Sequence, residues 1–332
     1  KAPNADGQVL SVARLSRPIF DESQIGFILT NGDPTGATDN SVFGGDYQYR
    51  NSNFLGDSIF QTDVFYQRSF SSSLGEDDSF GLALSLPNEP WAANASFKQI
   101  GENFEPALGF ANRTGIRIYD ANARRLTRFG PEHFLRQFAV SSNNLIITGL
   151  DDVVQSREHE ADLSLITRNN HSFGVRVINF YERVPAVFLL PGDVPVPVGR
   201  YEWTNIRASA QSSRFASISV GGEIACCSFF DGSSLETGLS ADFSPNRFYG
   251  ITARHNWTQL KMPTGNVDIH VATLSANVTF TPDMQLQLQT QYDNISENIG
   301  FLARYRWEFT PASELLIAFG QAAVIPTTGF MV

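Results

Sequence analysis

Residues 283–294 have the sequence DMQLQLQTQYDN. Apolar and amide side chains alternate along it, with Met284, Leu286 and Leu288 in one set and Gln285, Gln287, Gln289 and Gln291 in the other. Because a β-strand points successive side chains to opposite faces, this segment has one apolar face and one uncharged polar face. Such a strand fits a soluble protein, in which the core takes the apolar face and solvent takes the amides. It also fits a transmembrane barrel, in which the bilayer takes the apolar face and a water-filled lumen takes the amides. The rest of the chain has to decide between the two.

The same alternation recurs from end to end, and it is clearest in IGFLARYRWEFTP, residues 299–311. Clusters of Gly, Asn, Asp and Pro separate the alternating runs, which is the pattern of strands joined by short turns. Short connections imply antiparallel neighbours. We expect roughly 16–18 strands between about residues 8 and 322. The exception is a proline-rich segment at about 184–199, which we expect to be a long loop because its prolines exclude it from the interior strands of a sheet.

Composition favours the bilayer. The chain has 332 residues and a formal net charge of −10, and only 17% of its residues are charged, against roughly 25% in ordinary soluble domains. It nevertheless lacks any apolar run approaching the roughly 20 residues of a membrane helix. Low charge without long apolar runs is typical of a transmembrane barrel, in which only every second residue meets lipid. The acidic balance also argues against nucleic acid as a partner.

Other all-β architectures fit the sequence less well. Propellers and solenoids have a fixed sequence repeat, and none is present. A sandwich of this length needs two domains, yet the alternating pattern is continuous. Tryptophan and tyrosine fall near the ends of apolar-face segments, where barrels place their aromatic girdles. We therefore predict a single domain, residues 1–332, that folds as an all-β transmembrane antiparallel up-and-down β-barrel.

Strand parity assigns candidate residues to each face. The residues that we expect to face the lumen are Gln285, Gln287, Gln289, Gln291, Arg304, Arg306, Glu308, Arg254, Arg207, Glu158, Glu160, Asp162, Glu223, Glu236 and Asp242. The residues that we expect to face lipid, or to form the girdles, are Met284, Leu286, Leu288, Phe301, Tyr305, Trp307, Phe309, Trp257 and Trp203. A lumen wall of mixed charge either sets transverse fields in an open pore or forms a salt-bridged network that fills a closed one.

Three stretches resemble a known family. They are FEPALGFANRTGIRIYDANA (residues 104–123), SQIGFILTNGD followed by NSVFGGDYQYR (residues 23–33 and 40–50), and NIGFLARYRWEFTPASELLIAF (residues 298–319). Together they are similar to a bacterial outer-membrane β-barrel family of unknown function, in which the barrel often follows a family 9 carbohydrate-binding module. The resemblance implies the outer membrane of a Gram-negative cell envelope, with membrane lipid and lipopolysaccharide as surroundings. It implies no reaction, and a saccharide as solute comes only from the family's usual module, which this sequence lacks.

The leading functional prediction is therefore a porin-like passive pore or uptake conduit for saccharides or other small solutes. The first alternative is a closed structural barrel that anchors a surface or periplasmic partner. The second is a membrane-embedded hydrolase, for which His171 and His159 are the best candidates.

We expect no cofactor, no metal and no catalytic residue. The densest ionisable cluster is REHEAD, residues 157–162, where parity separates His159 from the carboxylates and leaves a charged wall or, alternatively, a divalent-cation site. His255 and His270 are expected to face each other across a turn at Met262-Pro263, as interface residues or as a two-imidazole metal site. The adjacent Cys226 and Cys227 allow a vicinal disulfide but no metal-binding CxxC spacing.

Overall fold

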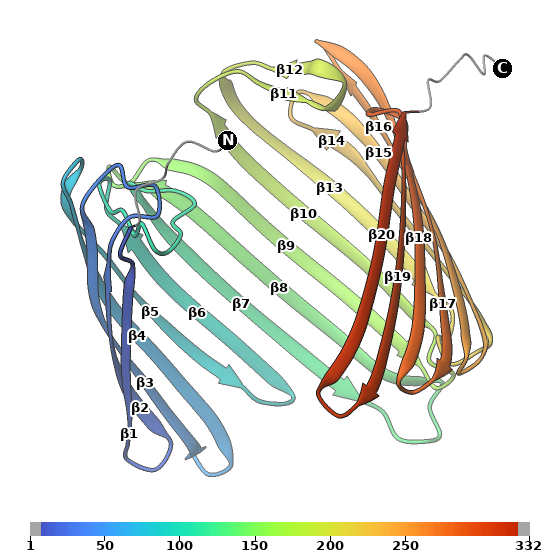
Figure 1. The fold of residues 1–332 in the computed structure, drawn as a ribbon, viewed down its shortest axis with the longest axis horizontal. Helices are drawn as coiled ribbons and strands as arrows, with labels where there is room; N and C mark the ends of the chain where they lie inside the picture. The colour runs from blue at the N-terminus through green and yellow to red at the C-terminus, as the bar shows by residue number, and fades with distance from the viewer. Residues whose placement is uncertain (1–7, 325–332) are drawn as a thin grey trace. The chain divides into compact units, whose positions relative to one another are not determined.

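The computed structural model describes residues 8–324, which form twenty β-strands and a single 3-10 turn (Figure 1). The first ten strands are β1 (Ser11–Ile19), β2 (Ser23–Asn31), β3 (Asn40–Phe54), β4 (Ser58–Ser71), β5 (Gly75–Pro87), β6 (Trp91–Ile100), β7 (Ile116–Arg128), β8 (Leu135–Gly149), β9 (Val154–Thr167) and β10 (Ser172–Val184). The remaining ten are β11 (Phe188–Leu190), β12 (Val194–Val196), β13 (Gly199–Gln211), β14 (Ile218–Phe229), β15 (Gly232–Asn246), β16 (Tyr249–Met262), β17 (Gly265–Thr281), β18 (Met284–Asp293), β19 (Asn298–Thr310) and β20 (Ser313–Val324).

Eighteen of these strands belong to one sheet, and β11 and β12 form a separate antiparallel hairpin. Ladders join successive antiparallel strands from β1 to β7 and from β13 to β20. The predictions of an all-β fold, of antiparallel order and of up-and-down connection are confirmed. Closure of the sheet into a transmembrane barrel stays a prediction. Within residues 8–324, no helix has both the length and the apolar character needed to cross a membrane.

Short turns set the register of neighbouring strands. Met262 of β16 pairs with Gly265 of β17, which leaves Pro263 and Thr264 as a two-residue turn. Gly265 has a φ of +154°, in the range that favours glycine over residues with a Cβ. Because side chains alternate with a period of two, a fixed register decides which residues reach each face of the sheet.

The chain divides into two compact units. Unit 1 comprises residues 1–126, 140–160 and 180–183, and unit 2 comprises residues 127–139, 161–179 and 184–332. The predicted single domain of residues 1–332 includes residues 1–7 and 325–332, which lie outside the described residues.

In unit 1, the sheet has two chemically distinct faces. Leu82 of β5 pairs with Val64 of β4 and with Phe97 of β6, so these three side chains share an apolar face. The opposite face, which we call the polar face of unit 1, carries Asp46 and Gln48 of β3.

The connection from β6 to β7, residues 101–115, packs on this polar face. Phe104 is buried against Ile100 and Ile116, which bracket the connection. Asn40, Ser69 and Ser71 also have the parity of the polar face, and all three hydrogen-bond to the connection. The segment is therefore held against the sheet by an apolar cluster and by polar anchors.

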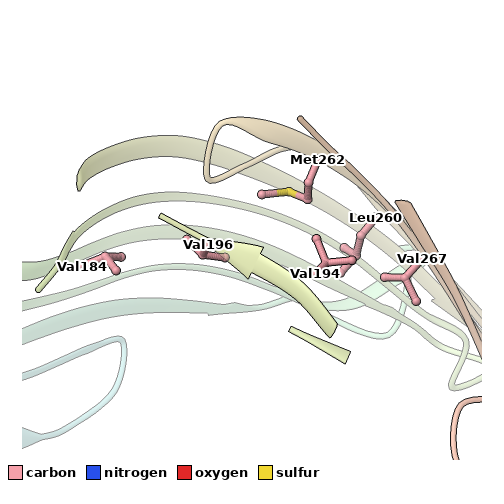
Figure 2. Close-up of a cluster of buried hydrophobic side chains, with 6 residues drawn as sticks. All are labelled: Val184, Val194, Val196, Leu260, Met262 and Val267. Carbon is pink, nitrogen blue, oxygen red and sulfur yellow. The ribbon is translucent and has the colours of Figure 1, made fainter. Parts of the chain in front are cut away.

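In unit 2, the proline-rich segment contains more structure than the predicted loop. The hairpin of β11 and β12 packs against the ends of β16 and β17, where Val194 and Val196 bury against Leu260, Met262 and Val267 (Figure 2). Thr264 fixes the arrangement by donating a hydrogen bond of 2.7 Å to the carbonyl oxygen of Pro195. The four prolines exclude this segment from the large sheet, but they leave room for a three-residue ladder.

Candidate functional site

The polar face of unit 2 is the side of β13–β20 that bears Arg207, Arg254 and Arg304. On β18 and β19 it is built as a ladder of amides and guanidiniums, with Gln287 opposite Arg304 and Gln285 opposite Arg306. On the other side of β18, Gln287 pairs with Asn277 and Gln289 pairs with Ser275. These groups supply both donors and acceptors, which is the chemistry that a polar solute needs.

The predicted lumen residues of unit 2 share this face by ladder register. They are Gln285, Gln287, Gln289, Gln291, Arg304, Arg306, Glu308, Arg254, Arg207, Glu223, Glu236 and Asp242. The separation of polar and apolar residues is incomplete, because Leu302 and Leu316 lie on the polar face as well.

Arg207 forms the centre of a three-strand ion-pair network. Its guanidinium on β13 binds the carboxylate of Glu223 on β14 and reaches Glu236 on β15, with 2.8 Å between Nη2 and Oε2. All three side chains are partly exposed to solvent, so we expect a modest contribution to stability. The network fixes the positions of these three charged side chains on the polar face of unit 2.

The positive charge of Arg306 is likewise paired with two carboxylates. Its Nη2 lies 3.0 Å from Oε2 of Glu308, and its Nε lies 2.7 Å from Oε2 of Glu314 on β20. Arg254 and Arg304 differ from both paired arginines. Within residues 8–324, neither guanidinium makes a hydrogen bond or an ion pair, and both side chains are exposed.

Three hollows adjoin one another on this face. The central one has a volume of about 520 Å³, and its lining includes Arg254, Arg304 and Gln289. It shares Arg254 with a hollow of about 410 Å³ that extends towards β13 and β14. It shares Gln289 and Leu302 with a hollow of about 610 Å³ that extends towards β20. The three form a continuous polar trough across unit 2.

The acidic cluster on β9 divides between the two units. In unit 1, Glu160 accepts a hydrogen bond of 2.7 Å from the side-chain amide of Asn143, and Glu158 has the same strand parity as Glu160. In unit 2, Asp162 lies 3.5 Å from Nε of Arg176. His159 has the opposite parity, as predicted, and its Nδ1 is 2.9 Å from Oδ1 of Asn144.

The two histidines near the β16–β17 turn are diagonal neighbours. His270 pairs with Trp257, and His255 pairs with Ala272, so the expected direct opposition is wrong by two residues. The imidazole rings still stack with centroids 5.5 Å apart, and Nδ1 of His270 lies 3.3 Å from Nε2 of His255. Among the described residues, no group of three His, Cys, Asp or Glu side chains could hold a metal ion.

The hydrolase candidate His171 lies at the start of the β10 hairpin. Its Nδ1 accepts a hydrogen bond of 3.2 Å from the backbone amide of Ser213. A ring nitrogen occupied by a backbone donor cannot at the same time accept the proton of a nucleophile. Cys226 and Cys227 are joined by a vicinal disulfide in β14.

The apolar face of unit 2 is the side of β13–β20 that bears Leu239, Leu286 and Tyr305. Pairing places Leu286 opposite Tyr305, and it places Met284 opposite Trp307. The predicted lipid-facing and girdle residues that share this face are Met284, Leu286, Leu288, Phe301, Tyr305, Trp307, Phe309 and Trp257.

Trp203, the remaining residue expected to face lipid or to form a girdle, does not share the apolar face of unit 2. Trp203 has the same strand parity as Arg207, and its ring lies 4.6 Å from the ring of Phe230 and 6.0 Å from that of Phe229. Those two phenylalanines pack on the cluster around the β11–β12 hairpin. Trp203 therefore belongs to the packing of that hairpin. The folded-back segment gives the ring an apolar contact on the face that is otherwise polar.

No protein-family profile matches the chain, and no curated protein matches it. The resemblance to the outer-membrane barrel family stays a prediction from the quoted stretches.

Proposed function

We propose that this chain is an outer-membrane β-barrel that conducts small solutes passively. The observation that carries the proposal is the separation of chemistries across one continuous run of ladders. On neighbouring strands, Leu286 and Tyr305 form one layer, while Gln287 and Arg304 form the opposite layer. A bilayer outside and water inside satisfy both layers at once.

The apolar face supports a lipid environment because it carries large uncovered side chains. Leu239 is 61% exposed, Ile317 is 54% exposed and Phe319 is 55% exposed. Soluble monomers rarely expose contiguous apolar patches larger than a few hundred Å². Hydrocarbon tails would cover this face without any further protein element.

The same environment requires that the sheet close. In hydrocarbon, every backbone donor and acceptor must be satisfied within the protein, and only helices and closed barrels achieve this. The proposal therefore includes closure of the sheet into a barrel. The polar trough of unit 2, with its amides and guanidiniums, then lines part of an aqueous lumen.

A second candidate function, a closed barrel that anchors a partner, is favoured by two inward-folding segments. In unit 1, residues 101–115 pack on the polar face around Phe104. In unit 2, the hairpin of β11 and β12 packs on the polar face around Val196. Each segment fills space that an open pore would leave to water.

Planar-bilayer recording of the purified, refolded chain separates the two candidates. Folding is checked first by heat-modifiable migration on a gel. Steady single-channel conductance that scales with salt concentration is the expected result. Folded protein that conducts nothing would overturn the pore and leave the anchor in its place.

A deletion variant then tests the hairpin as an obstruction. Residues 186–197 are replaced by an Asn-Gly turn, and the matched control replaces residues 55–57, in the exposed connection between β3 and β4, by the same turn. For a pore that is narrowed by the hairpin, we expect conductance to rise in the first variant alone. Equal conductance in both variants would mean that the hairpin does not limit flow.

A further inference from the structure

Two unpaired arginines of unit 2 share one hollow. Arg254 on β16 and Arg304 on β19 both line the central hollow of about 520 Å³. The other residues of its lining are Thr252, Ser275, Asn277, Gln287, Gln289, Leu288 and Leu302. Hydroxyl and amide groups of this kind donate and accept hydrogen bonds and carry no charge. The two guanidiniums are therefore the only charges that line the hollow among the described residues.

Two carboxylates, Asp242 and Glu223, lie near the central hollow but outside its lining. Asp242 on β15 is the ladder partner of Thr252 on β16, and it accepts a hydrogen bond of 2.7 Å from the hydroxyl of Thr252. Glu223 lines the adjoining hollow, but it is bound to Arg207. The lining of the central hollow itself has an excess of positive charge, because it includes two guanidiniums and no carboxylate, in a chain whose formal net charge is −10. Such an excess attracts anionic solutes.

The spacing of the two arginines favours an extended ligand. Arg254 pairs with Thr273 on β17. Arg304 pairs with Gln287 on β18, which in turn pairs with Asn277 on β17. The two arginines are three strands apart across the sheet and four residues apart along it. With strands roughly 4.8 Å apart and a rise of roughly 3.3 Å per residue, their Cα atoms are on the order of 20 Å apart. A ligand with several charges along its length matches this spacing better than one small ion does.

The flanking hollows extend the trough with further polar groups. On the β20 side the lining includes Gln291, Asn298, Gln321 and the carboxylate of Asp293, and on the β13 side it includes Gln211, Asn256, Arg214 and Glu223. Amides can make paired hydrogen bonds with neighbouring hydroxyl groups, and guanidiniums bind carboxylates in a two-pronged geometry. We propose that the trough binds an acidic oligosaccharide, a short chain of sugars that carry carboxylates, with Arg254 and Arg304 holding separate carboxylates. This inference names a solute class for the proposed pore and rests on it.

Isothermal titration calorimetry on the folded chain in detergent tests binding apart from transport. The probes are trigalacturonate, the neutral trisaccharide maltotriose and inorganic sulfate. We expect trigalacturonate to bind at least tenfold more tightly than either of the others. The double variant Arg254→Gln with Arg304→Gln should lose at least tenfold in affinity for trigalacturonate. The double lysine variant, which keeps both charges, should retain most of it.

Arg247→Gln provides the matched control, because Arg247 carries the same charge in the turn before β16 and lies against Phe248. Its affinity for trigalacturonate should equal that of the unmodified chain. Equal binding of maltotriose and trigalacturonate would overturn the inference in favour of a neutral-sugar site. Equal binding of sulfate and trigalacturonate would overturn it in favour of a simple anion site. Unchanged affinity in the double glutamine variant would overturn the assignment of the two arginines.

Bilayer recording of the same preparations distinguishes this inference from the proposed function. A chain that conducts but does not bind trigalacturonate contradicts the acidic-oligosaccharide site and leaves the pore standing. A chain that binds trigalacturonate but does not conduct contradicts the pore and leaves the binding site. Expected together are binding, conductance, and reversible block of that conductance by trigalacturonate added to one side.

Discussion

The side-chain amide of Asn40 donates a hydrogen bond of 2.8 Å to the backbone carbonyl of Glu105, a residue 65 positions later in the chain. The Oδ1 atom of the same amide accepts a bond of 3.2 Å from the backbone amide of Ala107. Asn40 is 3% exposed at the first position of β3, and residues 105 and 107 lie in the connection that packs on the polar face of unit 1. One buried side chain thus holds that connection by both of its functional groups.

Replacing Asn40 with alanine should loosen the connection. Removing both bonds leaves the partly buried carbonyl of Glu105 and amide of Ala107 without partners, which costs at most about 1–3 kcal/mol. We expect the free energy of unfolding to fall by that amount. Amide hydrogen exchange at residues 105 and 107 should also become faster. The control is Ser41→Ala, on the next residue and the opposite face. Unchanged exchange in the Asn40 variant would show that the apolar cluster alone holds the segment.

Neighbouring residues on β18 should respond oppositely to a charge. Leu286→Arg places a guanidinium on the apolar face, and in a bilayer this should cost about 2–4 kcal/mol near the midplane. Gln287→Arg places the same group on the polar face beside Arg304 and should cost much less. Urea unfolding of the two variants in liposomes measures the difference. Equal losses would contradict a bilayer around Leu286.

Arg207 should set ion selectivity through its two carboxylate partners. Arg207→Gln leaves Glu223 and Glu236 without their cation, so the wall becomes more negative. In a conducting chain, the reversal potential in a salt gradient should shift towards cation selectivity. Arg207→Lys keeps the charge and should leave the reversal potential near its original value. A shift of the same size in both variants would mean that geometry matters more than charge.

Asp33, in the connection between β2 and β3, should make stability depend on pH. Its carboxylate accepts hydrogen bonds from the hydroxyl and backbone amide of Thr35 and then from those of Thr38, which lower the pKa of Asp33 to about 2. The pKa is depressed in the folded state, so the contribution is present above the ordinary value near 4 and is lost as pH falls through about 2.

The variant Asp33→Asn tests this pH dependence. It should lower the midpoint of thermal unfolding at pH 7, where the native carboxylate is charged, and the difference should shrink between pH 4 and pH 2. Thermal scans across that range provide the measurement. A difference that persists unchanged at pH 2 would assign the effect to shape and not to charge.

Cys226 and Cys227 should resist alkylation until the chain is reduced. They are joined to each other in β14, so an unfolded, unreduced chain offers no free thiol within the described residues. Intact mass after treatment with iodoacetamide should show no added groups, and it should show two after prior reduction. Two added groups without reduction would contradict the disulfide.

The faces of the sheet were predictable because side-chain alternation has a period of two. Leu286 and Gln287 needed only their parity, and the turns preserved that parity from strand to strand. Parity could not predict which segments fold back onto the polar face. The bonds from Asn40 to the connection at residue 105 join distant positions that no local pattern links.

Trp203 shows a signal that sequence reasoning overlooked. Its position near a strand end suggested a girdle, but its parity matches that of Arg207. Leu260, Met262 and Val267 likewise put apolar side chains on the polar parity at the ends of β16 and β17. Apolar residues gathered on a polar face indicate a covering segment, and the adjacent proline-rich stretch supplies it.

The sequential pairing of the strands has a consequence for how such a chain changes over evolutionary time. From β13 to β20, each strand pairs with the next strand in sequence. Duplicating or deleting a whole hairpin, such as that of β17 and β18, therefore leaves the register within the other ladders unchanged. A gain or loss of a single residue within β18 reverses its two faces beyond that point. Genes for such sheets can grow in steps of two strands, while small insertions are tolerated mainly in the turns.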